Sequence, residues 1–133
     1  MITNTPSKLK WLIGTVALVL VVTGCGLLVG SHDARVEETG GNIERGEDLV
    51  RTHGCVACHS APGVASVENG YGPDFDGFAN NRLIAGQAEN TPENLVQFIL
   101  VPYAVAPGTS MPTLDIPEED ARDIATWLYT LDD

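Results

Sequence analysis

Residues 55–59 read Cys-Val-Ala-Cys-His, in which two cysteines are separated by two residues and followed at once by a histidine. This spacing is the attachment pattern of a c-type haem. The thiols of Cys55 and Cys58 would each add to one vinyl group of the porphyrin, and His59 would then lie beneath the iron as an axial ligand. The pattern therefore predicts one covalently bound haem c.

Two other uses of a cysteine pair fit this sequence less well. A closed zinc site needs further cysteine or histidine ligands at similar spacing, but the chain contains only Cys25, His32 and His53 besides the residues of the pattern. A thioredoxin-like dithiol requires alternating strand and helix patterns around the pair, and we find none. A zinc or dithiol module is thus a remote alternative, and we expect His32 and His53 to be solvated surface side chains.

Met111 is the candidate for the second axial ligand, because it is the only methionine besides Met1. It lies in the segment Pro107–Pro112, where the prolines and a glycine indicate a fixed loop, although a lone methionine can also be a core filler. A thioether favours ferrous over ferric iron and raises the potential relative to a second imidazole. With both sides of the iron occupied, we expect no catalytic residue and no small-molecule substrate.

An apolar segment near the N-terminus predicts a membrane anchor over residues 1–30. The run from Trp11 to Val29 carries no charge and would span roughly 28 Å as a helix, close to the hydrocarbon thickness of a bilayer. Lys8 and Lys10 precede the run, and Asp33, Glu37 and Glu38 follow it. The positive-inside rule then places the remainder of the chain outside a bacterial cytoplasmic membrane, facing the periplasm or the cell exterior.

Cys25 leaves a second form of anchoring open. Val22-Thr23-Gly24-Cys25 resembles the lipobox of bacterial lipoproteins, in which the cysteine is lipidated and the preceding 24 residues are removed as a signal peptide. The apolar residues that continue after Cys25 favour an uncut helix, in which the cysteine is a small apolar residue. We prefer the retained helix, and both alternatives place the protein at the membrane.

The charge of the chain excludes one class of partner. The formal net charge is -11, and the part beyond the apolar run holds all 18 acidic residues against five arginines, a net of -13. Such a surface excludes nucleic acid as a partner. It fits a partner with a basic patch, and it fits equally well a solubility adaptation, for example to high salt.

The remaining sequence predicts an all-α domain over residues 43–133, joined to the anchor by a flexible polar linker at residues 31–42 that contains a pair of glycines. No segment has the pattern of a strand. Residues 60–90 show little regular periodicity, which would be unusual in a compact domain unless the loop encloses a cofactor.

Three helices are expected within this domain. The first covers Ile43–Thr52 with Asn42 as its N-cap, and the second begins after Thr91, an N-cap followed by proline, and ends at Pro102. The third begins near Pro117 with acidic residues in its first turn and carries an apolar stripe of period 3.6 to the end of the chain.

These motifs, taken in their order along the chain, resemble class I cytochrome c over about residues 43–131. Gly46 matches the helix glycine that meets the C-terminal helix at Trp127, and Gly72-Pro73-Asp74-Phe75 resembles the family's Gly-Pro-x-Leu segment, with Phe75 in place of leucine. The resemblance implies three to five helices wrapped around one haem. It also implies that the Pro73 carbonyl accepts a hydrogen bond from Nδ1 of His59, which would orient the ring.

A closer resemblance is to the cytochrome c domain fused to subunit II of some bacterial haem-copper oxidases. It is carried by Ile84–Gly86, Asn90–Leu95 and Pro107–Pro112, although Phe98 and Tyr103 replace the usual tryptophan and glutamine. Since no copper-binding domain precedes these motifs in the sequence, we expect the chain to be a free-standing, membrane-tethered equivalent that carries electrons from a quinol-oxidising complex to a terminal oxidase.

Two other functions remain open. The chain could be a fixed haem subunit of an oxidase, a nitric oxide reductase or a periplasmic dehydrogenase. It could also be a peroxidase or gas sensor, which would require a labile Met111 and an open iron position.

Overall fold

The computed structural model describes residues 31–66 and 70–132, and the predicted anchor and Cys25 lie outside these ranges. The described residues form five α-helices, two 3-10 turns and one antiparallel hairpin: α2 (Ser31–Thr39), α3 (Ile43–Thr52), η2 (Cys55–Ala57), η3 (Phe78–Asn80), β1 (Leu83–Ile84), β2 (Ala88–Glu89), α4 (Pro92–Leu100), α5 (Pro102–Val105) and α6 (Glu118–Leu128). The prediction of a mainly helical domain is confirmed. Among these residues, no helix is long and apolar enough to cross a membrane.

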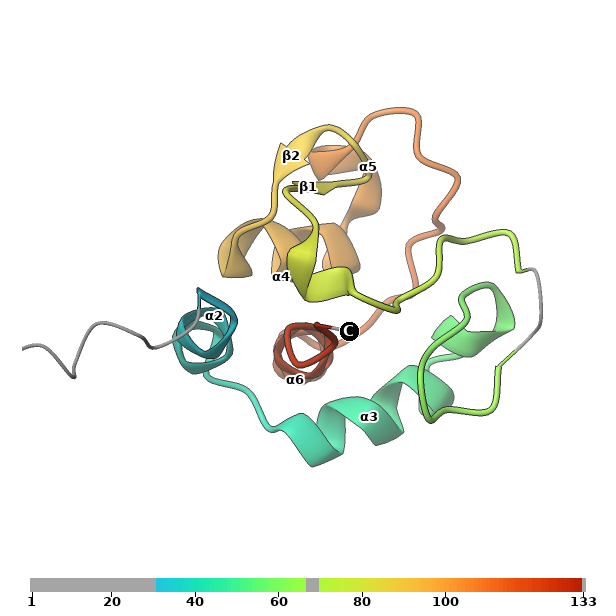
Figure 1. Ribbon diagram of the computed structural model, residues 1–133. Coiled ribbons are helices and arrows are strands. Elements are labelled where there is room, and N and C mark those ends of the chain that lie inside the picture. The colour runs from blue at the N-terminus through green and yellow to red at the C-terminus, as the bar shows by residue number, and fades with distance from the viewer. Residues whose placement is uncertain (1–30, 67–69, 133) are drawn as a thin grey trace, which may run out of the picture. The chain divides into compact units, whose positions relative to one another are not determined.

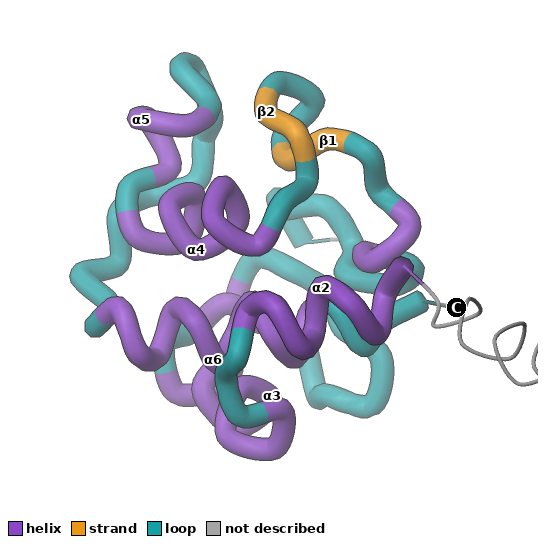
Figure 2. Tube along the Cα trace, turned by 90° about the vertical axis from the view of Figure 1, so that its left-hand side faces the viewer, coloured by secondary structure: helices purple, strands orange, loops and turns teal. Residues whose placement is uncertain are grey.

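Helix α6 is the central element of the domain. Figure 1 views it end-on, with α2, α3 and α4 around it, and Figure 2 shows α2, α3 and α6 as one layer below α4 and α5. Buried side chains from the helices, the hairpin and the loops form one apolar cluster: Val50, Ala61, Val64, Phe75, Ile84, Leu95, Val96, Ile99, Ile116, Ala121, Ile124, Ala125, Trp127, Leu128 and Tyr129.

Local capping signals predicted the helix starts correctly. The Asn42 side chain accepts a hydrogen bond from the Arg45 amide at 2.7 Å, and the Thr91 hydroxyl accepts one from the Asn94 amide at 3.3 Å. Pro117 precedes α6 as expected. Helix α4 ends before Pro102, and this proline then opens the short helix α5, where its missing N–H is not needed.

Helix α2 lies where the sequence predicted a flexible linker, so that prediction is wrong. Arg35 donates a hydrogen bond to the carbonyl of Ala79, and its guanidinium lies 4.7 Å from the ring centre of Tyr129. Val36 packs against the apolar cluster. The polar composition of the segment is typical of a linker, but Arg35 and Val36 attach the helix to remote parts of the domain.

The hairpin corrects the expectation that the domain has no strand. Its turn places Ala85 and Gly86 at φ of 49° and 70°, and the Gln87 amide donates to the Ile84 carbonyl at 3.0 Å. Two successive residues with positive φ are typical of the tight turns that close hairpins. Each strand has only two residues, which is too short for an alternating pattern to be visible in the sequence.

The glycine at position 46 allows α3 and α6 to cross in close contact, as predicted. A Cβ atom on Gly46 would lie 2.8 Å from Cβ of Trp127 and closer still to the carbonyl of Asp123. Glycine is unfavourable inside a helix by about 1 kcal/mol relative to alanine. The close packing of the two backbones explains why it is present here.

A charged cluster lies beside this crossing. Arg45 forms ion pairs with both Asp120 and Asp123, which are only 8% and 6% exposed. The Nε2 atom of His53 lies 2.8 Å from Oδ2 of Asp120, and the Asn42 amide donates to Oδ1 of Asp123 at 2.8 Å. The expectation that His53 is a solvated surface residue is therefore wrong, because the end of α3 meets the first turn of α6.

Replacing Gly46 tests the importance of the crossing. We expect Gly46→Ala to lower the free energy of unfolding by about 1–3 kcal/mol, the range for overpacking a close contact. Denaturant unfolding of the haem-loaded protein measures this change. Glu44→Ala, at an exposed position on the same helix, should change the stability by a few tenths of a kcal/mol. Equal stability of the Gly46→Ala variant and the parent would contradict the packing argument.

The burial of Tyr129 leads us to expect a loss of stability at alkaline pH. Burial raises the pKa of its phenol to about 12, although the charge of Arg35 acts in the opposite direction. The neutral hydroxyl donates to Oδ1 of Asn90 at 2.9 Å. Because an unfolded tyrosine ionises near pH 10, the folded state binds the proton more tightly, so this contribution is complete below about pH 10 and is lost as the pH rises towards 12.

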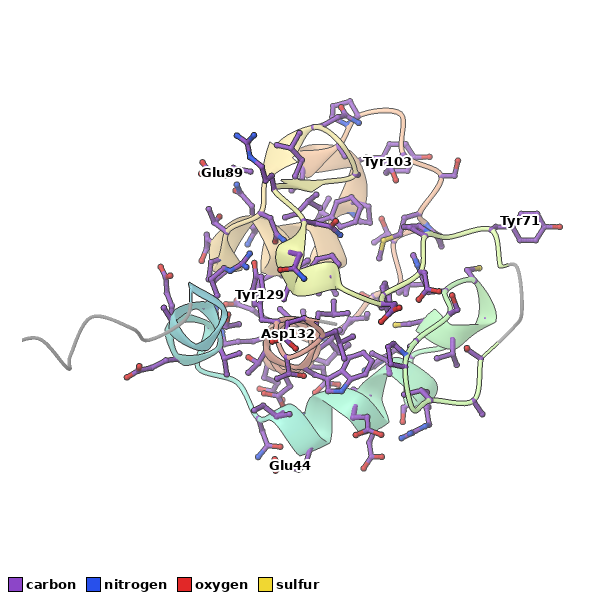
Figure 3. The ribbon with its side chains drawn as sticks, in the orientation of Figure 1. Glu44, Tyr71, Glu89, Tyr103, Tyr129 and Asp132 are labelled. Atoms are coloured by element: carbon purple, nitrogen blue, oxygen red, sulfur yellow. The ribbon has the colours of Figure 1, made fainter. Side chains whose placement is uncertain are left out.

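Unfolding by denaturant at several pH values between 9 and 12 measures this dependence. Tyr129→Phe should flatten it, whereas Tyr103→Phe, at an exposed position (Figure 3), should not. The same pH dependence in Tyr129→Phe and in the parent would contradict the assignment.

Candidate functional site

The pentapeptide begins directly after the end of α3. Gly54 has a left-handed φ of 74°, and the open space around it means that its backbone conformation, and not crowding, requires glycine. The amides of Cys58 and His59 both donate to the carbonyl of Cys55, at 3.1 and 3.0 Å. One tight turn therefore brings the two thiols and the imidazole together.

The two thiols are in different surroundings, and both are free. Cys55 is half-buried and packs against the apolar cluster, and burial raises the pKa of its thiol. Cys58 is exposed. Since neither sulfur is in a disulfide, both are available to form a thioether.

The imidazole of His59 is held by the backbone opposite it. Its Nδ1 lies 2.7 Å from the carbonyl oxygen of Pro73, so the predicted hydrogen bond is present. A carbonyl can only accept, so Nδ1 must carry the proton and Nε2 is left with its lone pair. This tautomer is the one that a metal ligand needs, and the hydrogen bond raises the basicity of Nε2.

The segment that contains Pro73 is itself fastened to the pentapeptide turn. The Gly72 amide donates to the Cys58 carbonyl at 2.8 Å, and the Phe75 amide donates to the Ser60 carbonyl at 2.9 Å. A Cβ atom on Gly72 would lie 2.7 Å from Nε2 of His59 and closer still to Cε1 and Nδ1. Only glycine permits this contact between backbone and ring.

Met111 lies in the loop between α5 and α6, as the sequence predicted. The loop starts at the buried Ala106 and ends at the buried Ile116, which belongs to the same apolar cluster as Phe75. The Met111 amide donates to the hydroxyl of Thr109 at 3.3 Å, and the side chain is half-buried. Figure 1 shows this loop, in orange, on the same side of α6 as the pentapeptide turn, in green.

A family model described as Cytochrome c matches residues 43–132. The chain belongs to the cytochrome c family. It is also 30% identical over 109 residues to the cytochrome c oxidase subunit 2 of Alkalihalophilus pseudofirmus, an alignment that covers 75% of this chain and 31% of that protein. No solved structure matches the chain.

These relationships confirm the resemblance that the motifs indicated, to class I cytochrome c and to the cytochrome c domain of oxidase subunit II. A cytochrome c carries covalent haem c, and the two free thiols on one turn fit that attachment. The cytochrome c domain makes the protein an electron carrier. The chain spans about a third of the length of its oxidase relative.

Two contacts of His59 were not apparent from the sequence. The family motif implied the hydrogen bond from Nδ1 of His59 to the Pro73 carbonyl, but the close approach of Gly72 and the stacking of Phe75 on the ring are visible only in the structure. The one signal was the departure at Phe75 from the leucine that is usual in the motif.

Proposed function

We propose that this cytochrome c transfers single electrons with His59 and Met111 as the two axial ligands of its haem iron. The observation that carries the proposal is the hydrogen bond between Nδ1 of His59 and the Pro73 carbonyl, which leaves Nε2 free to bind. When bound, haem c supplies an iron that alternates between the ferrous and ferric states.

The chain's own residues perform four tasks in this proposal. Cys55 and Cys58 hold the porphyrin covalently, so that haem is not lost in either oxidation state. His59 is already in the required tautomer and orientation, so binding needs little reorganisation. Met111 supplies a soft thioether from a loop fixed at both ends, and raises the potential relative to a second imidazole. The buried side chains around Phe75 exclude water from the site.

For its partners, we propose a terminal oxidase as acceptor and a quinol-oxidising complex as donor. The similarity to a protein named cytochrome c oxidase subunit 2 supports the acceptor. It equally favours a second candidate function, in which this chain is a fixed haem subunit of a larger oxidoreductase. Purification from solubilised membranes separates the two, because a fixed subunit would remain with the catalytic subunits through every step.

Attachment to the bacterial cytoplasmic membrane, with the haem domain on the outer side, is supported by the uncharged run from Trp11 to Val29 and the lysines before it. Either a retained transmembrane helix or a lipid on Cys25 would attach the protein to the membrane. Helix α2 changes how such a tether would work. Since Ser31–Thr39 form a helix of the folded domain, these residues would not serve as a flexible tether between the anchor and the domain.

Removing the thioether tests the ligand assignment. We expect Met111→Ala to open the sixth iron position, to abolish the charge-transfer absorption of sulfur-ligated ferric haem and to lower the midpoint potential. Haem should stay attached through Cys55 and Cys58. Absorption spectra and redox titration measure these changes, with Leu114→Ala as the control in the same loop. An unchanged ferric spectrum in Met111→Ala would exclude Met111 as the ligand.

The salt dependence of electron transfer tests the role of the acidic surface. If a basic partner docks on it, the second-order rate constant with the oxidase should fall by about tenfold or more between low and physiological ionic strength. The double variant Asp76→Asn with Asp115→Asn removes exposed charges near Phe75 and Met111, and should lower the rate at low salt. Glu44→Gln with Glu93→Gln, both exposed on helices, is the control. A flat response to salt would favour the solubility explanation.

A further inference from the structure

Phe75 makes a contact with His59 that leucine, the usual residue at this position of the motif, cannot make. The two rings are stacked, with centroids 4.4 Å apart and planes inclined by 16°. This is a near-parallel arrangement of two planar rings. Phe75 therefore touches a proposed iron ligand over the face of its ring.

The imidazole is constrained from several directions at once. The carbonyl of Pro73 holds Nδ1, but one hydrogen bond still allows the ring to swing about that contact, and the terminal torsion of a histidine has a broad energy well. The backbone of Gly72 lies directly against the ring, and Phe75 covers it by stacking. Contact with the face of the ring removes the rotation that the hydrogen bond leaves free.

Phe75 is a rigid support because it is itself fixed. Its side chain is 9% exposed, and its ring makes edge contacts with Phe78 and Trp127, at centroid distances of 6.4 and 6.5 Å. The preceding residue, Asp74, accepts a hydrogen bond from the Asp76 amide at 2.9 Å, and this bond lowers the pKa of its carboxyl. The turn closed by Asp74 directs the chain so that Phe75 enters the core. Tyr71, on the other side of Pro73, points away from the molecule (Figure 3).

We propose that Phe75 is a positioning residue that sets the plane of the His59 ring and maintains its hydrogen bond to Pro73. This inference rests on the proposed function, in which His59 ligates the iron. The orientation of an imidazole plane determines how it overlaps with the iron orbitals, and the strength of the Nδ1 hydrogen bond determines how strongly Nε2 donates. Through these two properties Phe75 influences the electronic structure and the potential of the centre.

The competing explanation is that Phe75 only fills the core. Phe78 allows the two to be separated, because it is also a phenylalanine of the aromatic cluster and contacts Phe75 and Tyr129, whereas the ring stacked on His59 is that of Phe75. A purely structural role predicts that leucine at either position lowers stability and leaves the iron centre unchanged.

The experiment compares Phe75→Leu, Phe78→Leu and Phe75→Tyr in the haem-loaded protein. Electron paramagnetic resonance of the ferric state reports the ligand plane, nuclear magnetic resonance of 15N-labelled histidine in the ferrous state reports the Nδ1 hydrogen bond, and redox titration gives the potential. Phe75→Leu should replace the parent signal with a broader one of different g values, move the Nδ1 resonance and raise the potential. Phe78→Leu, which keeps the ring stacked on His59, should change all three much less than Phe75→Leu does, and Phe75→Tyr, which keeps the ring, should retain the parent signal.

The inference is overturned if Phe75→Leu and Phe78→Leu have the same g values and Nδ1 resonance. It is also overturned if Phe75→Tyr, when folded by circular dichroism, loses the parent signal. The parent protein tests the proposed function separately, because a spectrum without histidine and sulfur ligation would refute that function whatever the variants show. If the parent shows histidine and sulfur ligation and Phe75→Leu has the g values and Nδ1 resonance of the parent, only the role of Phe75 is refuted.

Discussion

The close approach of α3 and α6 at Gly46 determines where the haem attachment turn lies. Because Gly46 has no side chain, the backbones of the two helices pack closely, and the end of α3 is brought to the start of α6. There His53, which is two residues before the attachment cysteine Cys55, lies within hydrogen-bonding distance of Asp120. The chain is therefore held in place just before the pentapeptide begins, although the turn formed by the pentapeptide is itself short and partly exposed.

The same crossing is connected to the proposed iron ligand through two side chains, those of Trp127 and Phe75. Trp127 lies against Gly46 with its Cβ atom and meets the ring of Phe75 with its indole, and Phe75 stacks on His59. The contacts run from the helix crossing to the imidazole without a gap. A substitution at the crossing is thus expected to alter the orientation of the His59 ring as well as the stability of the domain. The helix packing and the proposed ligand site are therefore not independent of each other.

Local signals in the sequence were sufficient for much of the fold, and long-range contacts account for what they missed. Asn42 and Thr91 cap helices through hydrogen bonds to residues three positions away, so their role is visible in a short window. Helix α2 depends on Arg35 reaching the carbonyl of Ala79, and His53 depends on a carboxylate 67 residues later. Neither partner can be identified from spacing. The attachment turn was predictable because haem chemistry fixes its residues within five positions, whereas the stacking on His59 depends on how a separate segment folds back.

The distribution of the arginines explains why the surface of the domain is so acidic. Arg45 pairs with Asp120 and Asp123 between α3 and α6, and Arg51 and Arg122 pair with carboxylates on their own helices. Arg35 is directed to backbone carbonyls. Four of the five arginines therefore stabilise helices and their contacts, and among the described residues the exposed acidic residues far outnumber the arginines. A negative field of this origin surrounds the domain broadly, so it can attract a basic partner over a distance but gives little information about which face docks. Specificity then has to come from particular positions on the surface, and the exposed carboxylates of Asp76 and Asp115 follow the segments that hold the two proposed ligands.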